Sequence, residues 1–223
     1  MTTTAVATGA SRGAGRGIAI GLGGAGMTVY VTGRSTDSTK SEYGASINET
    51  AEMVTKAGGK GIAVAVDHAD DGAVATFFER VAREAGTLDI LVNNAAKVLD
   101  PMPGGFWEKP LETLDLIAVG LLSHYVASYY AAPLLLKNGR GIIVNTGYYG
   151  AVSYHLSPAY GAQKAGADKM AADMALEQRA HNVAAISIWM GGLDTERARA
   201  FIATLPEASK PKNKRESPNS PDE

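Results

Sequence analysis

The sequence predicts an α/β protein with a Rossmann-like, doubly wound parallel sheet, arranged as a three-layer αβα sandwich. Short apolar or β-branched runs alternate with longer helical patterns along the chain, which is typical of a sheet with helices on both faces. The short runs are mostly continuous in their apolar character, as in strands that are buried on both faces. The 223 residues, 45% hydrophobic and 20% charged, have the composition of one soluble globular domain.

Six strands are predicted, at residues 4–8, 27–33, 61–66, 88–92, 141–146 and 183–189. Helices are predicted between them, near residues 13–25, 45–57, 71–85, 110–137 and 158–181. Each helix is long enough for the right-handed crossover that joins two parallel strands. These elements form one predicted domain, residues 1–205.

The composition changes at Pro206. Residues 206–223 are rich in Pro, Lys, Ser, Asn and Glu and contain almost nothing apolar to bury, which predicts a disordered polar tail. An alternative is a surface loop whose following helix and strand are absent from this chain.

Charge and cysteine content exclude several classes of function. With 21 basic and 23 acidic side chains the formal charge is -2, so no basic excess exists for a nucleic-acid partner. The absence of cysteine excludes disulfides, thiolate metal sites and cysteine nucleophiles, and the four histidines lack zinc-ligand spacing.

The N-terminus does not resemble a secretory signal, and Pro133 and several polar residues interrupt the apolar stretch 114–136. We expect a cytoplasmic protein without a membrane span.

A glycine-rich turn, residues 8–15, follows the first predicted strand and leads into the first helix. Glycines let backbone N–H groups approach a pyrophosphate, and a helix N-terminus adds partial positive charge at the same place. Glycine also serves ordinary turns, but at the strand-to-helix junction of a βαβ unit this pattern is a dinucleotide fingerprint.

The end of the second strand favours NADP over NAD. NAD-binding sheets usually place an acid there for the ribose 2'-hydroxyl, whereas this chain has Gly33 and Arg34. A guanidinium can bind a 2'-phosphate with forked hydrogen bonds, and Arg12 offers a second contact. The alternative is two solvated surface arginines.

Two further motifs complete a pattern: Asn93-Asn94-Ala95 after the fourth strand, and Tyr160 to Lys164 at the start of the helix after the fifth. With the glycine-rich turn they resemble the short-chain dehydrogenase/reductase family over residues 4–205. Residues 119–125 and 186–189 are similar to its dehydrogenase/reductase member 1 branch. The resemblance implies hydride transfer between NADP(H) and a carbonyl or secondary alcohol of an unknown small molecule.

Tyr160 and Lys164 are the candidate catalytic residues. They are i and i+4 on one helical face, so the ammonium is expected to lower the pKa of the phenol from about 10 toward working pH and make it a proton shuttle. By spacing alone, such a pair is more often structural.

The resemblance also implies cofactor contacts at individual positions. The phosphate contacts fall on Gly9, Ser11, Arg12, Gly13 and Gly15. The remaining contacts fall on Arg34 at the 2'-phosphate, Asp67 at the adenine, Asn94 and Ala95 on the adenosine ribose side, Tyr160 and Lys164 at the nicotinamide ribose, and Leu193 near the carboxamide. Asp67 has an alternative role as a helix cap together with Asp70 and Asp71.

The chain departs from the family pattern at several positions. Gly147 stands thirteen residues before Tyr160, where the family has a serine that polarises the carbonyl, and Thr146 and Tyr148 flank it. Gly120 replaces the asparagine that supports the proton relay. The last helix and strand of the family are expected to be missing. The resemblance is consistent with a homo-oligomer that forms through helices 110–137 and 158–181.

These departures keep two other functions open. One is a catalytically silent NADP-binding protein that acts as a sensor or assembly partner. The other is a structural Rossmann-like subunit that binds nothing, which the intact glycine-rich turn and Arg34 argue against.

Overall fold

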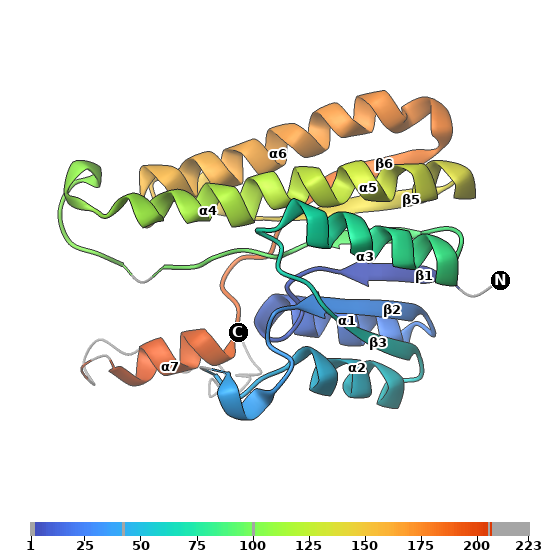
Figure 1. Ribbon diagram of the computed structural model, residues 1–223. Helices are drawn as coiled ribbons and strands as arrows, with labels where there is room; N and C mark the ends of the chain where they lie inside the picture. Colours follow the sequence, from blue (N-terminus) through green and yellow to red (C-terminus); the bar gives the residue numbers. More distant parts are fainter. Residues whose placement is uncertain (1–2, 42, 100, 205, 207–223) are drawn as a thin grey trace, which may run out of the picture.

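A computed structural model of the chain describes residues 3–41, 43–99, 101–204 and 206. Six parallel strands form one sheet in the order β3-β2-β1-β4-β5-β6 (Figure 1). The strands are β1 (Thr4–Ala7), β2 (Thr28–Gly33), β3 (Lys60–Ala65), β4 (Ile90–Asn93), β5 (Gly141–Gly147) and β6 (Val183–Trp189). This order reverses between β1 and β4, so the predicted doubly wound, Rossmann-like sheet is confirmed.

Helices cover both faces of the sheet, as the three-layer prediction requires (Figure 1). On one face, α1 (Gly13–Gly24) and α2 (Ile47–Lys56) pack on β1 and β2 through a core that includes Ala19, Val29, Val31, Ile47 and Val54. On the other face, α3 (Asp71–Glu84), α5 (Ser123–Asn138) and α6 (Pro158–Gln178) enclose a larger core that includes Phe77, Phe78, Leu91, Leu135 and Ile143.

The single helix expected over residues 110–137 is divided into four pieces. They are η3 (Leu111–Leu114), α4 (Asp115–Ile117), the π-helical turn η4 (Ala118–Leu122) and α5. By length and composition alone the span Leu111–Asn138 could cross a membrane, but 44% of its most apolar window is buried inside the structure. Leu134 and Leu135 belong to the core beneath α5, as in the central helix of a globular domain.

A helix that the sequence did not predict follows β6. The last predicted element is the strand at residues 183–189, whereas the structure places a further helix, α7 (Glu196–Thr204), beyond it. Short helical turns that were also not predicted are η1 (Ser38–Lys40), η2 (Phe106–Glu108), η5 (Tyr149–Ala151) and η6 (Arg179–His181). The predicted tail, residues 206–223, lies outside the described residues apart from Pro206.

Part of one sheet face is open to solvent. On β6, Ile186 and Ile188 are 40% and 43% exposed, on the side of the sheet opposite to the core that contains Val183 and Ala185. Helices α1 and α2 pack on the other half of this face.

Close packing of α2 on β3 generates a stability prediction. A Cβ atom at Gly61 would lie 2.0 Å from the backbone oxygen of Ala51 in α2, so Gly61→Ala must displace the helix. We expect it to lower the free energy of unfolding by about 2 kcal/mol or more. The matched control is Gly21→Ala in α1, where nothing lies within 4 Å of the added atom. It should stabilise by about 0.5–1 kcal/mol because glycine is unfavourable inside a helix.

Urea denaturation followed by circular dichroism measures both variants. Equal midpoints for Gly61→Ala and Gly21→Ala would show that α2 does not approach β3 as closely as the structure has it.

Candidate functional site

The carboxyl ends of β1 and β4 meet where the strand order reverses, and a hydrogen-bonded clamp joins the two turns that follow them. The hydroxyl of Thr8 donates to the carbonyl of Val92 at 3.1 Å and accepts the N–H groups of Asn94 and Ala95 at 2.8 and 3.0 Å. In return, the amide of Asn94 donates to the carbonyls of Thr8 and Gly9 at 2.9 and 3.1 Å. The clamp therefore fixes the glycine-rich turn against the end of β4.

Two of the predicted glycines are required by this clamp. Gly9 has φ +60°, and a Cβ atom there would lie 2.6 Å from Cα of Ala95. A Cβ atom at Gly15 would lie 2.4 Å from Nδ2 of Asn94. The backbone of the turn can lie this close to Asn94 and Ala95 only because both positions lack a side chain.

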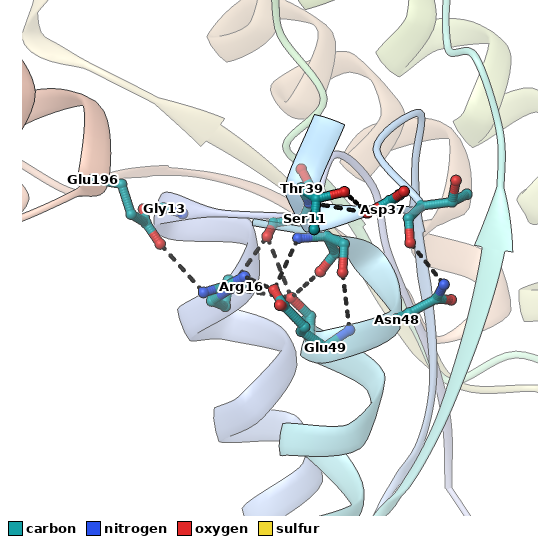
Figure 2. A network of polar contacts seen from close by, with 11 residues as sticks. Ser11, Gly13, Arg16, Asp37, Thr39, Asn48, Glu49 and Glu196 are labelled. Atoms are coloured by element: carbon teal, nitrogen blue, oxygen red, sulfur yellow. Dashed lines mark hydrogen bonds and ion pairs between the residues drawn. The ribbon is translucent and has the colours of Figure 1, made fainter. Parts of the chain in front are cut away.

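The glycine-rich turn leads directly into α1, and Figure 2 shows Gly13, the first residue of this helix, beside Glu196. The N–H of Gly13 donates to the carboxylate of Glu196 at 2.9 Å, and the N-cap residue Arg12 provides no side-chain cap of its own. The carbonyl of Ser11 accepts from Nε of Arg16 at 3.2 Å, and Arg16 also lies 3.4 Å from a carboxylate oxygen of Glu49. Arg16 was not predicted as a site residue.

The two arginines expected at the adenosine end lie in different surroundings. The guanidinium of Arg12 stacks over the ring of Tyr43, 4.3 Å from its centroid. Arg34 is 75% exposed at its side chain, and its guanidinium lies 3.9 Å from the carboxylate of Asp67. The N-cap of α3 is Asp70, so the alternative role of Asp67 as the cap of that helix is wrong.

Tyr160 and Lys164 lie in the first two turns of α6. This helix begins at Pro158, and the hydroxyl of Ser157 caps it by accepting the N–H of Tyr160 at 3.2 Å. Lys164 is 8% exposed; its ammonium lies 5.7 Å from the centroid of the Tyr160 ring and donates to the carbonyl of Thr146 at 3.0 Å. The i, i+4 spacing thus brings the pair together, beside the end of β5.

The expected lowering of the phenol pKa is wrong for this arrangement. Burial, followed by the neighbouring Tyr148, raises the pKa of Tyr160 to about 12. Burial lowers the pKa of Lys164 to about 8, while Asp168 acts in the opposite direction. Loss of water disfavours the charged form of both groups, and this outweighs the attraction that the spacing alone suggests.

The space beside Gly147 is filled by other side chains. A Cβ atom there would lie 2.5 Å from the hydroxyl oxygen of Ser187, 2.7 Å from the Trp189 ring and 3.0 Å from a carboxylate oxygen of Asp168. Asp168 accepts hydrogen bonds from both Ser187 and Trp189. A serine at position 147 would therefore require these groups to move.

The two residues that flank Gly147, Thr146 and Tyr148, lie in different surroundings. Thr146 is buried and contacts Lys164 through its carbonyl. The ring of Tyr148 lies 6.3 Å from that of Tyr160 and 5.1 Å from that of His155. Tyr148 is therefore the flanking residue whose side chain lies beside the catalytic candidate.

The space beside Gly120, the second position that departs from the family pattern, is also occupied by another side chain. A Cβ atom at Gly120, in the π-helical turn η4, would lie 1.8 Å from Nε2 of Gln163. Gln163 is 1% exposed and immediately precedes Lys164. The absence of a side chain at Gly120 thus makes room for the amide of Gln163.

Asn93, which belongs to the Asn93-Asn94-Ala95 motif, is part of a buried polar network that was not predicted. The amide of Asn93 donates to Ser128 and to Asn145, both at 2.9 Å, and Asn145 donates to the carbonyl of Ala167 at 3.0 Å. His124 contacts the carbonyl of Ala95 at 3.0 Å. The network joins β4, β5, α5 and α6; asparagine at the end of an otherwise apolar strand was the signal that would have found it.

Leu193 lies 40% exposed between β6 and α7, and none of the contacts described for the turn involves it. Beside the start of α6 a small depression is lined by Leu99, Met102, Lys109, Thr113, Leu116, Leu156 and Ser157. None of these lining residues was predicted as a site residue.

Comparisons with known proteins agree with this geometry. The family model described as short chain dehydrogenase matches residues 3–205. Proteins named dehydrogenase/reductase SDR family member 1, from Mus musculus and Homo sapiens, are 41% identical over 204 residues, which is 89% of this chain and 63% of theirs. The chain therefore spans less than two thirds of the length of these curated relatives.

Solved structures show the same fold. A metagenomic short-chain oxidoreductase in complex with NADP matches with a TM-score of 0.75 at 30% identity, over 93% of this chain and 92% of that one. A double variant of a Serratia marcescens short-chain dehydrogenase/reductase matches with a TM-score of 0.72 at 30% identity, over 84% of this chain and 73% of its own. Together with the clamped glycine-rich turn and the Tyr160–Lys164 pair, these matches show that the chain belongs to the short-chain dehydrogenase family of oxidoreductases.

Proposed function

We propose that this chain binds NADP(H) and transfers hydride between it and a carbonyl or secondary alcohol of a small molecule. The proposal is supported by the clamp between Thr8 and Asn94, which holds the glycine-rich turn at the N-terminus of α1. The Tyr160–Lys164 pair lies on α6 beside β5, and β5 is two strands away from β1, which the turn follows. In such sheets the crevice at the reversal of strand order is where dinucleotides bind.

The residues present fit a dinucleotide. The amide of Gly13 already holds a carboxylate, which shows that this position accepts an anion. The residues proposed to hold the phosphates are Gly9, Ser11, Arg12, Gly13 and Gly15. Proposed contacts to the rest of the cofactor are Asp67 at the adenine, Asn94 and Ala95 at the adenosine ribose, Tyr160 and Lys164 at the nicotinamide ribose, and Leu193 near the carboxamide.

The proposed preference for NADP over NAD depends on Arg34. No carboxylate stands at the end of β2 to repel a 2'-phosphate, and the exposed guanidinium of Arg34 is available for forked hydrogen bonds. Asp67 lies close to Arg34, so a bound phosphate would compete with this carboxylate. The NADP complex of the metagenomic relative supports the same choice.

The proposed proton donor is the phenol of Tyr160. When bound, NADPH supplies the hydride, and the carbonyl oxygen then needs a proton. Because burial raises the pKa of Tyr160 to about 12, the phenol is protonated at neutral pH and carries the proton that reduction requires. Lys164, whose pKa burial lowers to about 8, lies beneath the ring and orients it.

Turnover is proposed to be slow because Gly147 provides no donor to the carbonyl oxygen. Loss of one such donor costs a factor of about 10² to 10³ in comparable sites. Restoring a serine at Gly147 is not expected to recover this factor by itself, since Ser187 and Trp189 fill the space. The same filled space favours the second candidate function, a catalytically silent NADP-binding protein.

We further propose that the chain forms a homo-oligomer and is cytoplasmic. A homo-oligomer through α5 and α6 is supported by apolar side chains exposed on and beside these helices, namely Leu122, Tyr125, Tyr129 and Leu176. A cytoplasmic location is compatible with the cysteine-free composition.

Charge reversal at Arg34 tests the cofactor preference. We expect Arg34→Asp to weaken NADPH binding about tenfold or more, because the 2'-phosphate loses its guanidinium and gains a repelling carboxylate. NADH binding should stay the same or improve. Fluorescence titration measures both, with Arg83→Asp on the exposed side of α3 as the control for charge. An unchanged NADPH preference in Arg34→Asp would remove Arg34 from the 2'-phosphate site.

Removal of one hydroxyl tests the proton donor. We expect Tyr160→Phe to reduce carbonyl reduction by about 10²-fold or more while NADPH affinity changes little, because only the proton is lost. Lys164→Ala should impair both. The measurement is NADPH consumption against a panel of carbonyl compounds.

Tyr148→Phe is the matched control for this prediction, since it removes a hydroxyl from the ring beside Tyr160. Activity that survives in Tyr160→Phe but disappears in Tyr148→Phe would assign the proton to Tyr148. Detectable NADPH binding without any turnover in the wild-type protein would favour the silent cofactor-binding function.

A further inference from the structure

A carboxylate of the chain itself occupies the N-terminus of α1. One oxygen of Glu196 accepts the N–H of Gly13 at 2.9 Å, and the other lies 3.5 Å from the guanidinium of Arg16 (Figure 2). Helix α1 has no acidic residue in its own first turn, and the side chain of Arg12 does not cap it. Glu196, 183 residues away along the sequence, thus takes the role of the capping anion.

The residue before Glu196 covers the same turn. A Cβ atom at Gly13 would lie 3.4 Å from the methyl group of Thr195, which places this side chain in contact with the turn. The hydroxyl and carbonyl of Thr195 accept the N–H groups of Ala198 and Arg199, so Thr195 also caps the start of α7. Thr195 and Glu196, at the start of α7, therefore both contact the glycine-rich turn.

The contacts described between helix α7 and the rest of the protein are hydrogen bonds and ion pairs of its first residues. None of its nine residues is buried. Besides the contacts of Glu196, Arg197 donates to the carbonyl of Val98 at 2.9 Å. A segment with little buried apolar surface opens at a lower free-energy cost than the core does. Displacing Glu196 therefore does not require disruption of either hydrophobic core.

We propose that Glu196 is a built-in competitor of the cofactor, whose carboxylate occupies the pyrophosphate position until NADP(H) displaces it together with α7. This inference rests on the proposed role of the turn as the dinucleotide site. A carboxylate and a phosphate both seek the same amide and guanidinium donors, and their like charges repel at short distance. The carboxylate of Glu196 and a cofactor phosphate therefore cannot both accept a hydrogen bond from the N–H of Gly13 at the same time.

The competition lowers the apparent affinity for the cofactor and couples its arrival to movement of α7. If only a fraction of molecules have Glu196 released, the apparent dissociation constant rises by the inverse of that fraction. Leu193, three residues before Glu196, belongs to the same connection between β6 and α7. Release of Glu196 therefore also repositions the residue proposed to lie near the carboxamide.

The test is an isothermal titration of NADPH into the wild-type protein and Glu196→Gln. Glutamine keeps the size of the side chain but loses the charge that competes with phosphate, so we expect binding about three- to thirtyfold tighter. Glu79→Gln removes the same charge from an exposed position on α3 and should bind as the wild type does.

Hydrogen exchange of residues 193–204 is the second measurement. Saturating NADPH should accelerate exchange in the wild type, and Glu196→Gln should exchange faster even without NADPH. Equal affinities of wild type and Glu196→Gln, or exchange that neither change alters, would overturn the competition and leave the dinucleotide site in place. No binding of NADPH or NADH to any of the three proteins would overturn the proposed function as well.

Discussion

Reciprocal hydrogen bonds that involve Thr8 and Asn94 hold together the two turns that follow β1 and β4. A buried hydroxyl and a largely buried amide must be paired, and here each satisfies backbone groups of the opposite turn. The pairing brings β1 and β4 to a common end and leaves room only for glycine at positions 9 and 15. The turn leads into α1, whose first N–H group, that of Gly13, donates to an anion, the carboxylate of Glu196.

Much of this arrangement could be predicted from local patterns. Continuous apolar runs located the six strands to within a few residues, because central strands such as β1 and β2 are buried on both faces, and the less buried strands β3 and β6 are apolar too. Tyr160 and Lys164 could be found because the i, i+4 spacing within one helix fixes their relative positions. The glycine-rich turn and Asn94 could be found because each directly follows a predicted strand. These motifs predicted the family membership that the family model confirms.

What could not be predicted depends on residues far apart in the sequence. Arg16 and Glu196 contact each other only because α7 returns to the start of α1. Gln163 fills the space that Gly120 leaves, although 43 residues separate them in the sequence. The sign of the pKa shift at Tyr160 depended on burial, which no spacing rule contains. Each of these features requires knowledge of packing, whereas the predicted features required only periodicity.

In the proposed function, the clamped turn at the N-terminus of α1 binds the phosphates of a dinucleotide. Amide-resolved NMR of the wild-type protein during titration with NADPH follows each N–H group of this turn separately. We expect the largest chemical-shift changes at the amides of Gly9, Gly13 and Gly15 and at those of Asn94 and Ala95. Saturable binding that leaves these five amides unchanged, or no shift changes at all, would contradict it.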